Sequence, residues 1–216
     1  QARILAIGHH CDLAVLTVED SKYFDKSKAL SFGDVPQLNS PVSSIGYPIG
    51  GEQISITRGV VSRLSHRLYV HSGLHSHLLI QVDSAINPGN SGGPVFSEGH
   101  LIGVAFQGFR AAENTGYVIP IPVIKHFLED VKRKEETKLR YSGIETQDMA
   151  MLNDSTLSYH QLSKASGVRV SYVYDRGFAA GKVEEGDILL AVEGHDVGVD
   201  GKIALYGESI SYRTLV

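Results

Sequence analysis

The chain has 216 residues, of which 42% are hydrophobic, and its formal net charge is −4. This length predicts one large domain or two small ones, and the scattered basic residues give no sign of nucleic-acid binding. No apolar run reaches the ~18 residues that a membrane-spanning helix needs. The single cysteine, Cys11, excludes an intrachain disulfide.

Short strand-like runs fill the chain from Ala2 to about Pro120, and glycine, proline and asparagine interrupt them. The runs are "RILAIG", "CDLAVLTV", "PVSSIGYP", "ISITRGVVSRL", "HLLIQV", "GPVFSEGHLIGVAFQG" and "GYVIPI". In "VFSEGHLIGVAF" two strands flank Glu98-Gly99, which predicts a hairpin. Short strands at this spacing predict a β-barrel or a β-sandwich.

The pattern changes in "IPVIKHFLEDVKRKEETK", which predicts a helix. Its apolar face would comprise Val123, Ile124, Phe127, Leu128 and Val131. Basic residues near its end suit the helix dipole. The charged tail that follows predicts a domain boundary near Lys138.

A second small unit follows the boundary. "GVRVSYVY" alternates like a half-buried strand. "FAAGKVEEGDILLAVEGHDV" predicts a short helical segment, a tight turn at Gly186-Asp187 and a buried strand "ILLAV".

The stretch "QVDSAINPGNSGGPVF", residues 81–96, places Ser91 among three glycines. A serine nucleophile needs a base and nearby donors for the oxyanion that forms. The amides of Gly89 and Ser91 would converge in a tight turn, while Gly92 and Gly93 would leave room for a substrate. The alternative is a glycine-rich turn whose serine makes a local hydrogen bond. No helical pattern follows Ser91, so this is not an esterase elbow.

"DSAINPGNSGGPVF" resembles the nucleophile segment of the Deg/HtrA serine proteases, a branch of the trypsin-like peptidases. "HHCDLAVLTV" is similar to the family's strand with the triad aspartate. "GYPIGG" and "DGKIALYGESISYRTLV" most resemble Deg proteases of plant organelles. The resemblance covers nearly the whole chain and implies an all-β-dominated fold. Residues 1–136 would form a chymotrypsin-like double β-barrel lacking part of its N-terminal barrel, and 139–216 a C-terminally truncated PDZ domain.

The resemblance also implies roles for individual residues. Ser91 would be the nucleophile, Asp12 would orient a histidine, and the amides from Gly89 through Asn90 to Ser91 would form the oxyanion hole. In the family that histidine precedes the aspartate by a few tens of residues, so we expect it upstream of Gln1. His9 and His10 do not replace it, and this chain alone would have little or no activity.

Substrate preference follows from the family's spacing, in which the base of the primary pocket lies six residues before the nucleophile. That position is Ala85, with Ile86 beside it, and neither carries a charge. Phe106, Gln107 and Gly108 would lie beside the substrate backbone. The sequence therefore predicts cleavage after small or medium apolar residues, which are buried in folded proteins, and so favours unfolded substrates.

In the second unit "YSGI", formed by Tyr141, Ser142, Gly143 and Ile144, stands where a PDZ domain binds a peptide carboxylate. Such a domain takes up an extended peptide by strand addition. The alternative is a PDZ domain that packs between subunits, since a fold does not fix a function.

The resemblance implies an ATP-independent serine endopeptidase of protein quality control that needs no cofactor or metal. It also implies a homotrimer, or a multiple of trimers, in a chloroplast or mitochondrion rather than a bacterial envelope. The alternative is a catalytically inactive relative that acts as a chaperone or as a PDZ-based scaffold.

Histidines at 9–10 and in "HSGLHSH", residues 71–77, raise the question of a metal site. A structural zinc site usually has four ligands in compact pairs, and the chain has no cysteine pair, so we expect an exposed hairpin loop at 71–77 instead. Cys11 is expected to be a buried strand residue. Asp83 is expected to cap backbone amides rather than act as an acid.

Overall fold

Strands dominate the computed structural model, which describes residues 2–25, 27–48, 53–108, 115–133, 144–148, 154–162, 165–175, 177 and 179–215. The chain divides into two compact units, residues 1–138 and 139–216. In the described part of the chain, no helix is long and apolar enough to cross a membrane.

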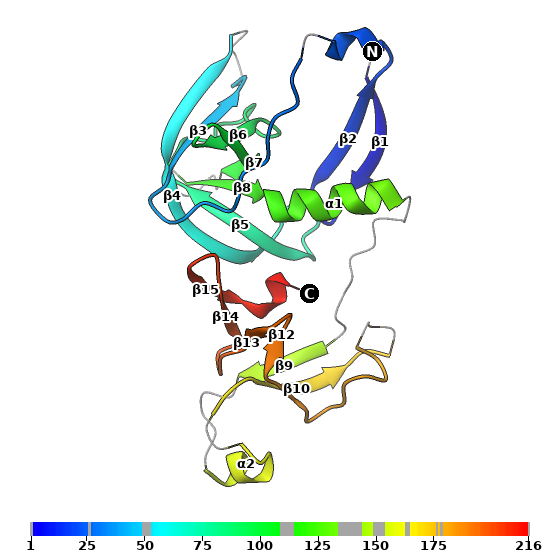
Figure 1. Cartoon of the computed structure of the whole chain (residues 1–216), viewed down its shortest axis with the longest axis vertical. Coiled ribbons are helices and arrows are strands. Elements are labelled where there is room, and N and C mark those ends of the chain that lie inside the picture. Colours follow the sequence, from blue (N-terminus) through cyan, green and yellow to red (C-terminus); the bar gives the residue numbers. More distant parts are fainter. Residues whose placement is uncertain are drawn as a thin grey trace. The chain divides into compact units, whose positions relative to one another are not determined.

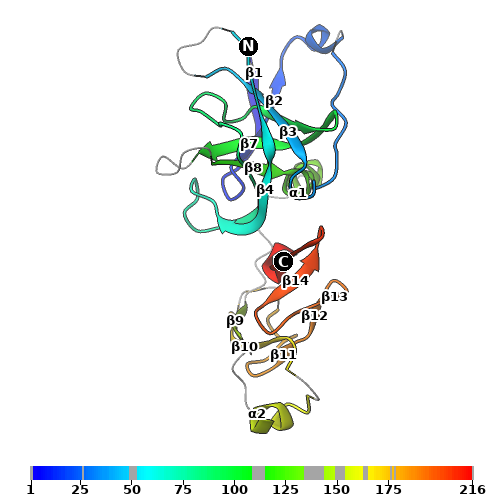
Figure 2. The same ribbon diagram turned by 90° about the vertical axis from the view of Figure 1, so that its left-hand side faces the viewer.

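Six strands of the first unit close into a barrel in the order β3-β4-β5-β8-β7-β6 (Figure 1). Figure 2 shows β3, β4, β7 and β8 of this barrel after a quarter turn. The strands are β3 (Pro41–Gly46), β4 (Ser55–Leu68), β5 (Ser76–Val82), β6 (Pro94–Ser97), β7 (His100–Gly108) and β8 (Gly116–Pro120). All six pairs are antiparallel, and the pair of β3 with β6 closes the ring. The prediction of a β-dominated fold with a barrel is confirmed.

The hairpin between β6 and β7 forms where the sequence predicts it. Glu98 and Gly99 both have positive φ, 51° and 78°. This is the backbone conformation that a two-residue type I′ turn requires, and its twist matches that of the flanking strands.

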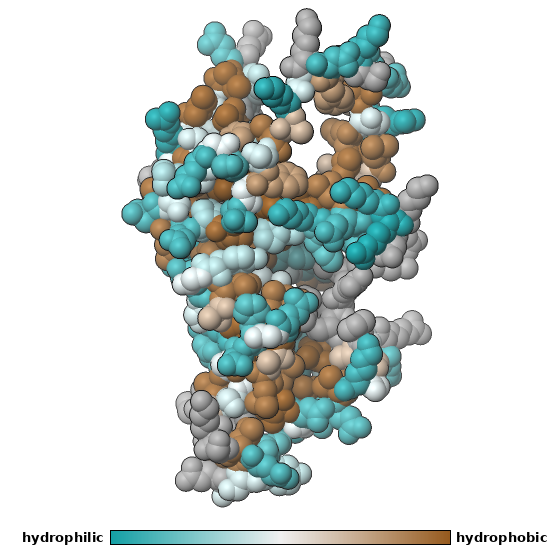
Figure 3. All heavy atoms as spheres, viewed as in Figure 1, coloured by the Kyte–Doolittle hydropathy of each residue, from teal (hydrophilic) through white to brown (hydrophobic). Residues whose placement is uncertain are grey.

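A two-stranded hairpin precedes the barrel, formed by β1 (Ala2–Gly8) and β2 (Leu13–Val18), and the 3₁₀ turn η1 (Ser21–Phe24) follows it. Its side chains are largely exposed: those of Ile4, Leu5, Ile7 and Leu16 keep between 45% and 58% of their surface. Figure 3 shows this hydrophobic surface over the hairpin.

The tip of the hairpin packs on helix α1 (Ile121–Arg133), which crosses the hairpin's lower end in Figure 1. A Cβ atom at Gly8 would lie 2.8 Å from Cys11 Sγ and 2.8 Å from the Phe127 ring. Cys11 is buried, as expected, but it lies in the turn between β1 and β2 rather than in a strand.

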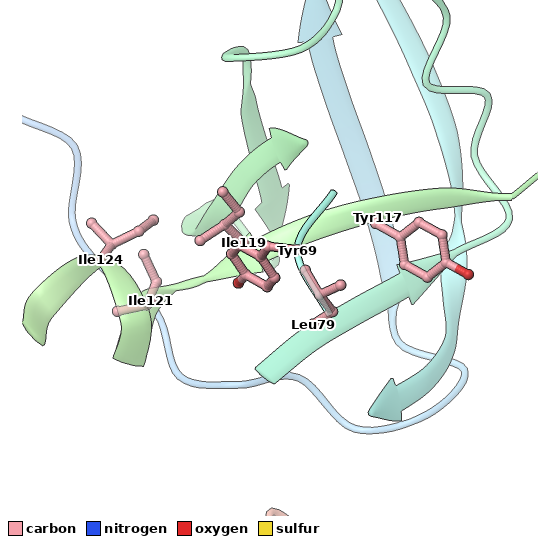
Figure 4. Packing of buried hydrophobic residues seen from close by; sticks show 6 residues of the cluster. All are labelled: Tyr69, Leu79, Tyr117, Ile119, Ile121 and Ile124. Carbon is pink, nitrogen blue, oxygen red and sulfur yellow. The ribbon is translucent and has the colours of Figure 1, made fainter. Parts of the chain in front are cut away.

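The core of the first unit joins α1 to the barrel, as Figure 4 shows. Its buried members are Tyr69, Leu79, Tyr117, Ile119, Ile121 and Ile124. Burial of each large aliphatic side chain stabilises the fold by about 1.5–3 kcal/mol. The predicted helical face is confirmed at Ile124 and Phe127, but this face also buries Asp130, which the apolar pattern had not indicated.

The second unit contains short strands and one described helix. They are β9 (Ile144–Asp148), α2 (Asp154–Tyr159), β10 (Val168–Val173), β11 (Ile188–Leu189), β12 (Ala191–Val192), β13 (His195–Asp196), β14 (Lys202–Leu205), β15 (Glu208–Ser211) and the 3₁₀ turn η2 (Tyr212–Thr214). The sheets are β11-β10-β9, β12-β13 and β14-β15. A small core surrounds the buried side chains of Ile144, Val170 and Ala179.

Two sequence expectations for this unit are wrong. Residues 179–183 form turns rather than a helical segment. The expected strand "ILLAV" is two short strands separated at Leu190, whose side chain is 47% exposed. The second difference arises because strands of two residues leave little regular backbone for a periodic pattern to reveal.

Candidate active site

Residues 83–93, here called the Ser91 loop, connect β5 to β6 and are fastened at their start by Asp83. The Val60 amide donates a hydrogen bond to Asp83 Oδ1 at 2.6 Å. Gly59 packs against the start of the loop, because a Cβ atom there would be only 2.6 Å from the Ser84 nitrogen. The predicted capping role of Asp83 is confirmed, and this carboxylate fixes the entrance of the loop.

Ala85 and Ile86, the expected base of the primary pocket, are tied to strands on two sides. The Ala85 carbonyl accepts a hydrogen bond from Thr57 Oγ1 at 3.0 Å. Ile86 is buried against β8, because Gly116 leaves space for its side chain. The two residues bring no charge to this part of the loop.

Gly89 and Asn90 make the turn that precedes the serine. Gly89 has a φ of 100°, in the region that glycine tolerates best. The Asn90 amide donates to the Asn87 carbonyl at 3.0 Å, and the Asn90 side chain is buried against Gly46 of β3. Gly89 and Ser91 lie on the exposed side of the turn.

The Ser91 hydroxyl is exposed and donates a hydrogen bond to the Phe106 carbonyl of β7 at 3.0 Å. The Gly92 amide donates to the Ala105 carbonyl at 2.7 Å, and the Ala105 amide donates to the Gly93 carbonyl at 2.8 Å. The end of the loop is thus bonded to β7. The serine does make a hydrogen bond within the fold, but to a strand distant in sequence rather than within its own turn.

Different physical constraints explain why glycine occupies the two positions after the serine. A Cβ atom at Gly93 would collide with the Ile45 carbonyl of β3, so glycine lets the loop approach the barrel. Gly92 has a φ of 85° and open space around its missing Cβ atom, so its backbone conformation explains the glycine. Space for a substrate, the expected reason, is not needed to explain Gly93.

Phe106 contributes its backbone carbonyl to the site. Its ring points into the core and packs against Tyr69, with ring centroids 4.9 Å apart. Gln107 and Gly108 continue β7 and pair with Tyr117 and Gly116 of β8.

Asp12 lies in the turn at residues 9–12 between β1 and β2, here called the Asp12 turn, with a φ of 53°. Its Oδ1 is 3.6 Å from Nδ1 of His71, which belongs to the loop between β4 and β5. His71 Nε2 is in turn 3.1 Å from Nδ1 of His9. Sequence reasoning missed this contact, because nothing in either motif indicates that the two turns meet.

The exposed loop expected at 71–77 is exposed at His71, Gly73 and Leu74, but Ser76 and His77 are half-buried and already belong to β5. Among the described residues, no group of three or more His, Cys, Asp or Glu side chains could hold a metal ion. Burial raises the pKa of the Cys11 thiol to about 12, so this thiol stays protonated and is a poor nucleophile.

Of the four residues expected in the peptide-binding loop of the second unit, Tyr141, Ser142 and Gly143 lie outside the described residues. Ile144 begins β9, and its side chain is 5% exposed in the core of the second unit.

Comparisons with known proteins match both the first part of the chain and the chain as a whole. Residues 1–104 match the trypsin-like peptidase domain. The whole chain aligns with Protease Do-like 4, mitochondrial, of Arabidopsis thaliana at 38% identity over 221 residues, or 42% of that protein. The chain is homologous along its whole length to Deg/HtrA serine proteases.

A second family member, Protease Do-like 2, chloroplastic, of the same plant, is 38% identical over 222 residues, with 100% of this chain and 36% of that protein covered. The chain thus spans about two fifths of the length of the curated relatives it matches. The solved structure of the HtrA-type protease AlgW with a tripeptide matches at a TM-score of 0.67 and 22% identity, over 96% of this chain and 74% of that one. This likeness confirms the β-dominated fold with its closed barrel.

Proposed function

We propose that the protein is an ATP-independent serine endopeptidase that degrades unfolded or damaged proteins, with Ser91 as its nucleophile. The observation that carries this proposal is the Ser91 hydroxyl, exposed at a turn whose flanks are bonded to Val60 and Ala105 of the barrel. A nucleophile held on rigid elements keeps the geometry that attack on a carbonyl requires.

In the proposed reaction the Ser91 hydroxyl leaves the Phe106 carbonyl, at a cost of about 1 kcal/mol, and gives its proton to an imidazole. Oγ then attacks the scissile carbonyl, and the amides of Gly89 and Ser91 stabilise the oxyanion. Asp12 orients the imidazole and stabilises its protonated form, and the imidazole returns the proton to the leaving amine. Water hydrolyses the acyl-enzyme by the same steps.

The base is proposed to be the histidine that the family carries upstream of the aspartate, so residues 1–216 alone would have little activity. His71 contacts Asp12, but its other ring nitrogen faces His9 rather than Ser91. Replacement of His71 by alanine in the full-length protein distinguishes the two bases. Retention of at least a tenth of the activity supports the upstream histidine, while a loss of about 1,000-fold or more assigns the role to His71.

Cleavage after small or medium apolar residues is proposed from Ala85 and Ile86, which bring no charge to the pocket. Replacement of Ala85 by aspartate should move the preference toward Lys or Arg, measured with a library of peptide substrates. An unchanged preference would contradict the assignment of the pocket.

Residues 139–216 are proposed to be a PDZ domain, and the full-length protein a homotrimer or a multiple of trimers in a chloroplast or mitochondrion. The relatives named mitochondrial and chloroplastic support the compartment. The likeness to AlgW, one of whose structures was solved with a decapeptide, extends over 96% of this chain and so supports a shared two-unit organisation. Analytical ultracentrifugation of the full-length protein tests the trimer.

The decisive experiment is casein digestion by the full-length protein, by Ser91→Ala and by the matched control Ser62→Ala, an exposed serine on β4. The Ser91 variant should lose activity by at least about 1,000-fold, because no other hydroxyl replaces the nucleophile. The Ser62 variant should digest casein at the unmodified rate. Equal rates for all three proteins would rule out the proposed enzyme and favour an inactive chaperone or scaffold.

A further inference from the structure

Three histidines meet where the Asp12 turn packs on the β4–β5 loop and the start of β5, and we call them the histidine contact: His10, His75 and His77. His77 Nε2 lies 3.2 Å from the His10 carbonyl oxygen. The centroid of the His10 ring is 6.0 Å from that of His77 and 6.3 Å from that of His75. Because a carbonyl only accepts, Nε2 of His77 carries a proton, and its Nδ1 is the position left for a second one.

The surroundings of the histidine contact disfavour positive charge. The pKa of His77 is lowered to about 4, chiefly by burial and further by the nearby rings of His10, His66 and His75. Its hydrogen bond to the His10 carbonyl acts in the opposite direction. Neutral imidazoles are therefore the state that this packing accommodates.

His10 is faced by titratable groups from three elements, and its pKa is also lowered. Burial is the largest cause, followed by His75 of the β4–β5 loop. From α1, Asp130 raises the pKa and His126 lowers it, and His9 of the same turn also lowers it. Only the buried Asp130 carboxylate favours a charged His10 among these groups, while the neighbouring histidines oppose it when they are protonated.

We propose that the histidine contact is an acid-sensitive latch between the Asp12 turn and the β4–β5 loop. The latch closes while its imidazoles are neutral, and it opens as they take up protons. A histidine whose pKa is lowered by folding contributes stability that is complete above its ordinary value of 6.5. That stability is lost as the pH falls from 6.5 toward about 4, the value for His77.

The latch reaches the Ser91 loop through two aromatic rings. The His77 ring packs edge-on against Tyr69, with centroids 4.8 Å apart, and Tyr69 packs on Phe106 at 4.9 Å. The Phe106 carbonyl accepts the hydrogen bond from Ser91. Opening of the latch removes one side of the packing around Tyr69 and frees the turn that carries Asp12. Acid would then lower the proteolytic rate, a consequence that rests on the proposed function.

Amide hydrogen exchange tests the latch without reference to activity. The full-length protein, His77→Gln, His10→Gln and the control His100→Gln, an exposed histidine beside the β6–β7 turn, are compared at pH 7.5 and 5.0. Protection of residues 69–82, corrected for intrinsic exchange rates, should fall by about 10- to 30-fold in the unmodified protein and in the control, as the lowered pKa of His77 implies. His77→Gln should reduce that fall to about threefold or less, while His10→Gln, which keeps the buried His77 imidazole but removes one neighbouring ring, should reduce it by a smaller amount.

Two results overturn the latch: a fall below about threefold in the unmodified protein, or an unchanged fall in both variants. A second measurement, the pH dependence of kcat/KM with Ser91→Ala as the inactive reference, separates the latch from the proposed function. If Ser91→Ala digests casein normally, the function fails and the exchange result stands on its own. If Ser91→Ala is inactive but exchange shows no fall, only the latch fails.

Discussion

The Ser91 loop and the Asp12 turn carry the two proposed catalytic side chains, yet they are held in different ways. The Ser91 loop lies between strands of a closed barrel, with hydrogen bonds to Val60 at one end and to Ala105 at the other. The Asp12 turn belongs to a two-stranded hairpin, and side-chain contacts with α1 and with the β4–β5 loop hold it. Backbone pairing therefore positions the serine, while packing and titratable groups position the aspartate.

Replacement of Gly93 by alanine should have the largest effect of the substitutions that test this difference. The new methyl group meets the Ile45 carbonyl, a backbone atom that cannot turn away. We expect a loss of about 3 kcal/mol in the free energy of unfolding, measured with urea. In the control Gly99→Ala nothing lies within 4 Å, and only the positive φ of 78° opposes the change, so about 1 kcal/mol is expected.

Replacement of Gly8 by alanine makes the corresponding change in the Asp12 turn. Its methyl group would lie 2.8 Å from the Cys11 sulfur and from the Phe127 ring, and both of these are side chains that shift. We therefore expect a smaller loss, about 1–2 kcal/mol, in the same urea titration. A loss as large as that of Gly93→Ala would contradict the distinction between backbone and side-chain support.

Removal of the Asp83 carboxylate tests the start of the Ser91 loop. Asp83→Ala leaves the Val60 amide without its acceptor and should cost about 1 kcal/mol. Asp83→Asn keeps an acceptor oxygen and should cost less than half as much. Similar losses for the two variants would mean that charge, and not the hydrogen bond, matters at this position.

The smallest effect is expected at Asp130, on the face of α1 that meets the Asp12 turn. Asp130 raises the pKa of His10, so Asp130→Asn should lower that pKa further, as followed by NMR titration of the imidazole. Glu129→Gln, an exposed neighbour on the helix, is the control and should leave the titration unchanged. A rise in the pKa of His10 in the Asp130 variant would contradict the arrangement.

Much of the barrel could be predicted because its strands alternate and its turns carry glycine. Glu98-Gly99 marked a hairpin, and the Ser91 stretch marked a loop between two strands. The sequence could not show that His71 and His77 reach the Asp12 turn, because contacts between distant segments leave no local periodicity. It also missed the buried Asp130, since a charged residue at a helical position suggests solvent until a fold covers it.

The pairing of β3 with β6, which closes the barrel, has a consequence for the order in which the chain folds. Strand β6 pairs with β3 at Val95 and Phe96, across most of the length of the barrel sequence, and the Ser91 loop ends where β6 begins. Pairings between distant segments form late, since their loop entropy must be overcome first. In a growing or partly unfolded chain the Ser91 loop therefore lacks its hydrogen bonds to the barrel, and the arrangement proposed for catalysis forms only once the barrel has closed.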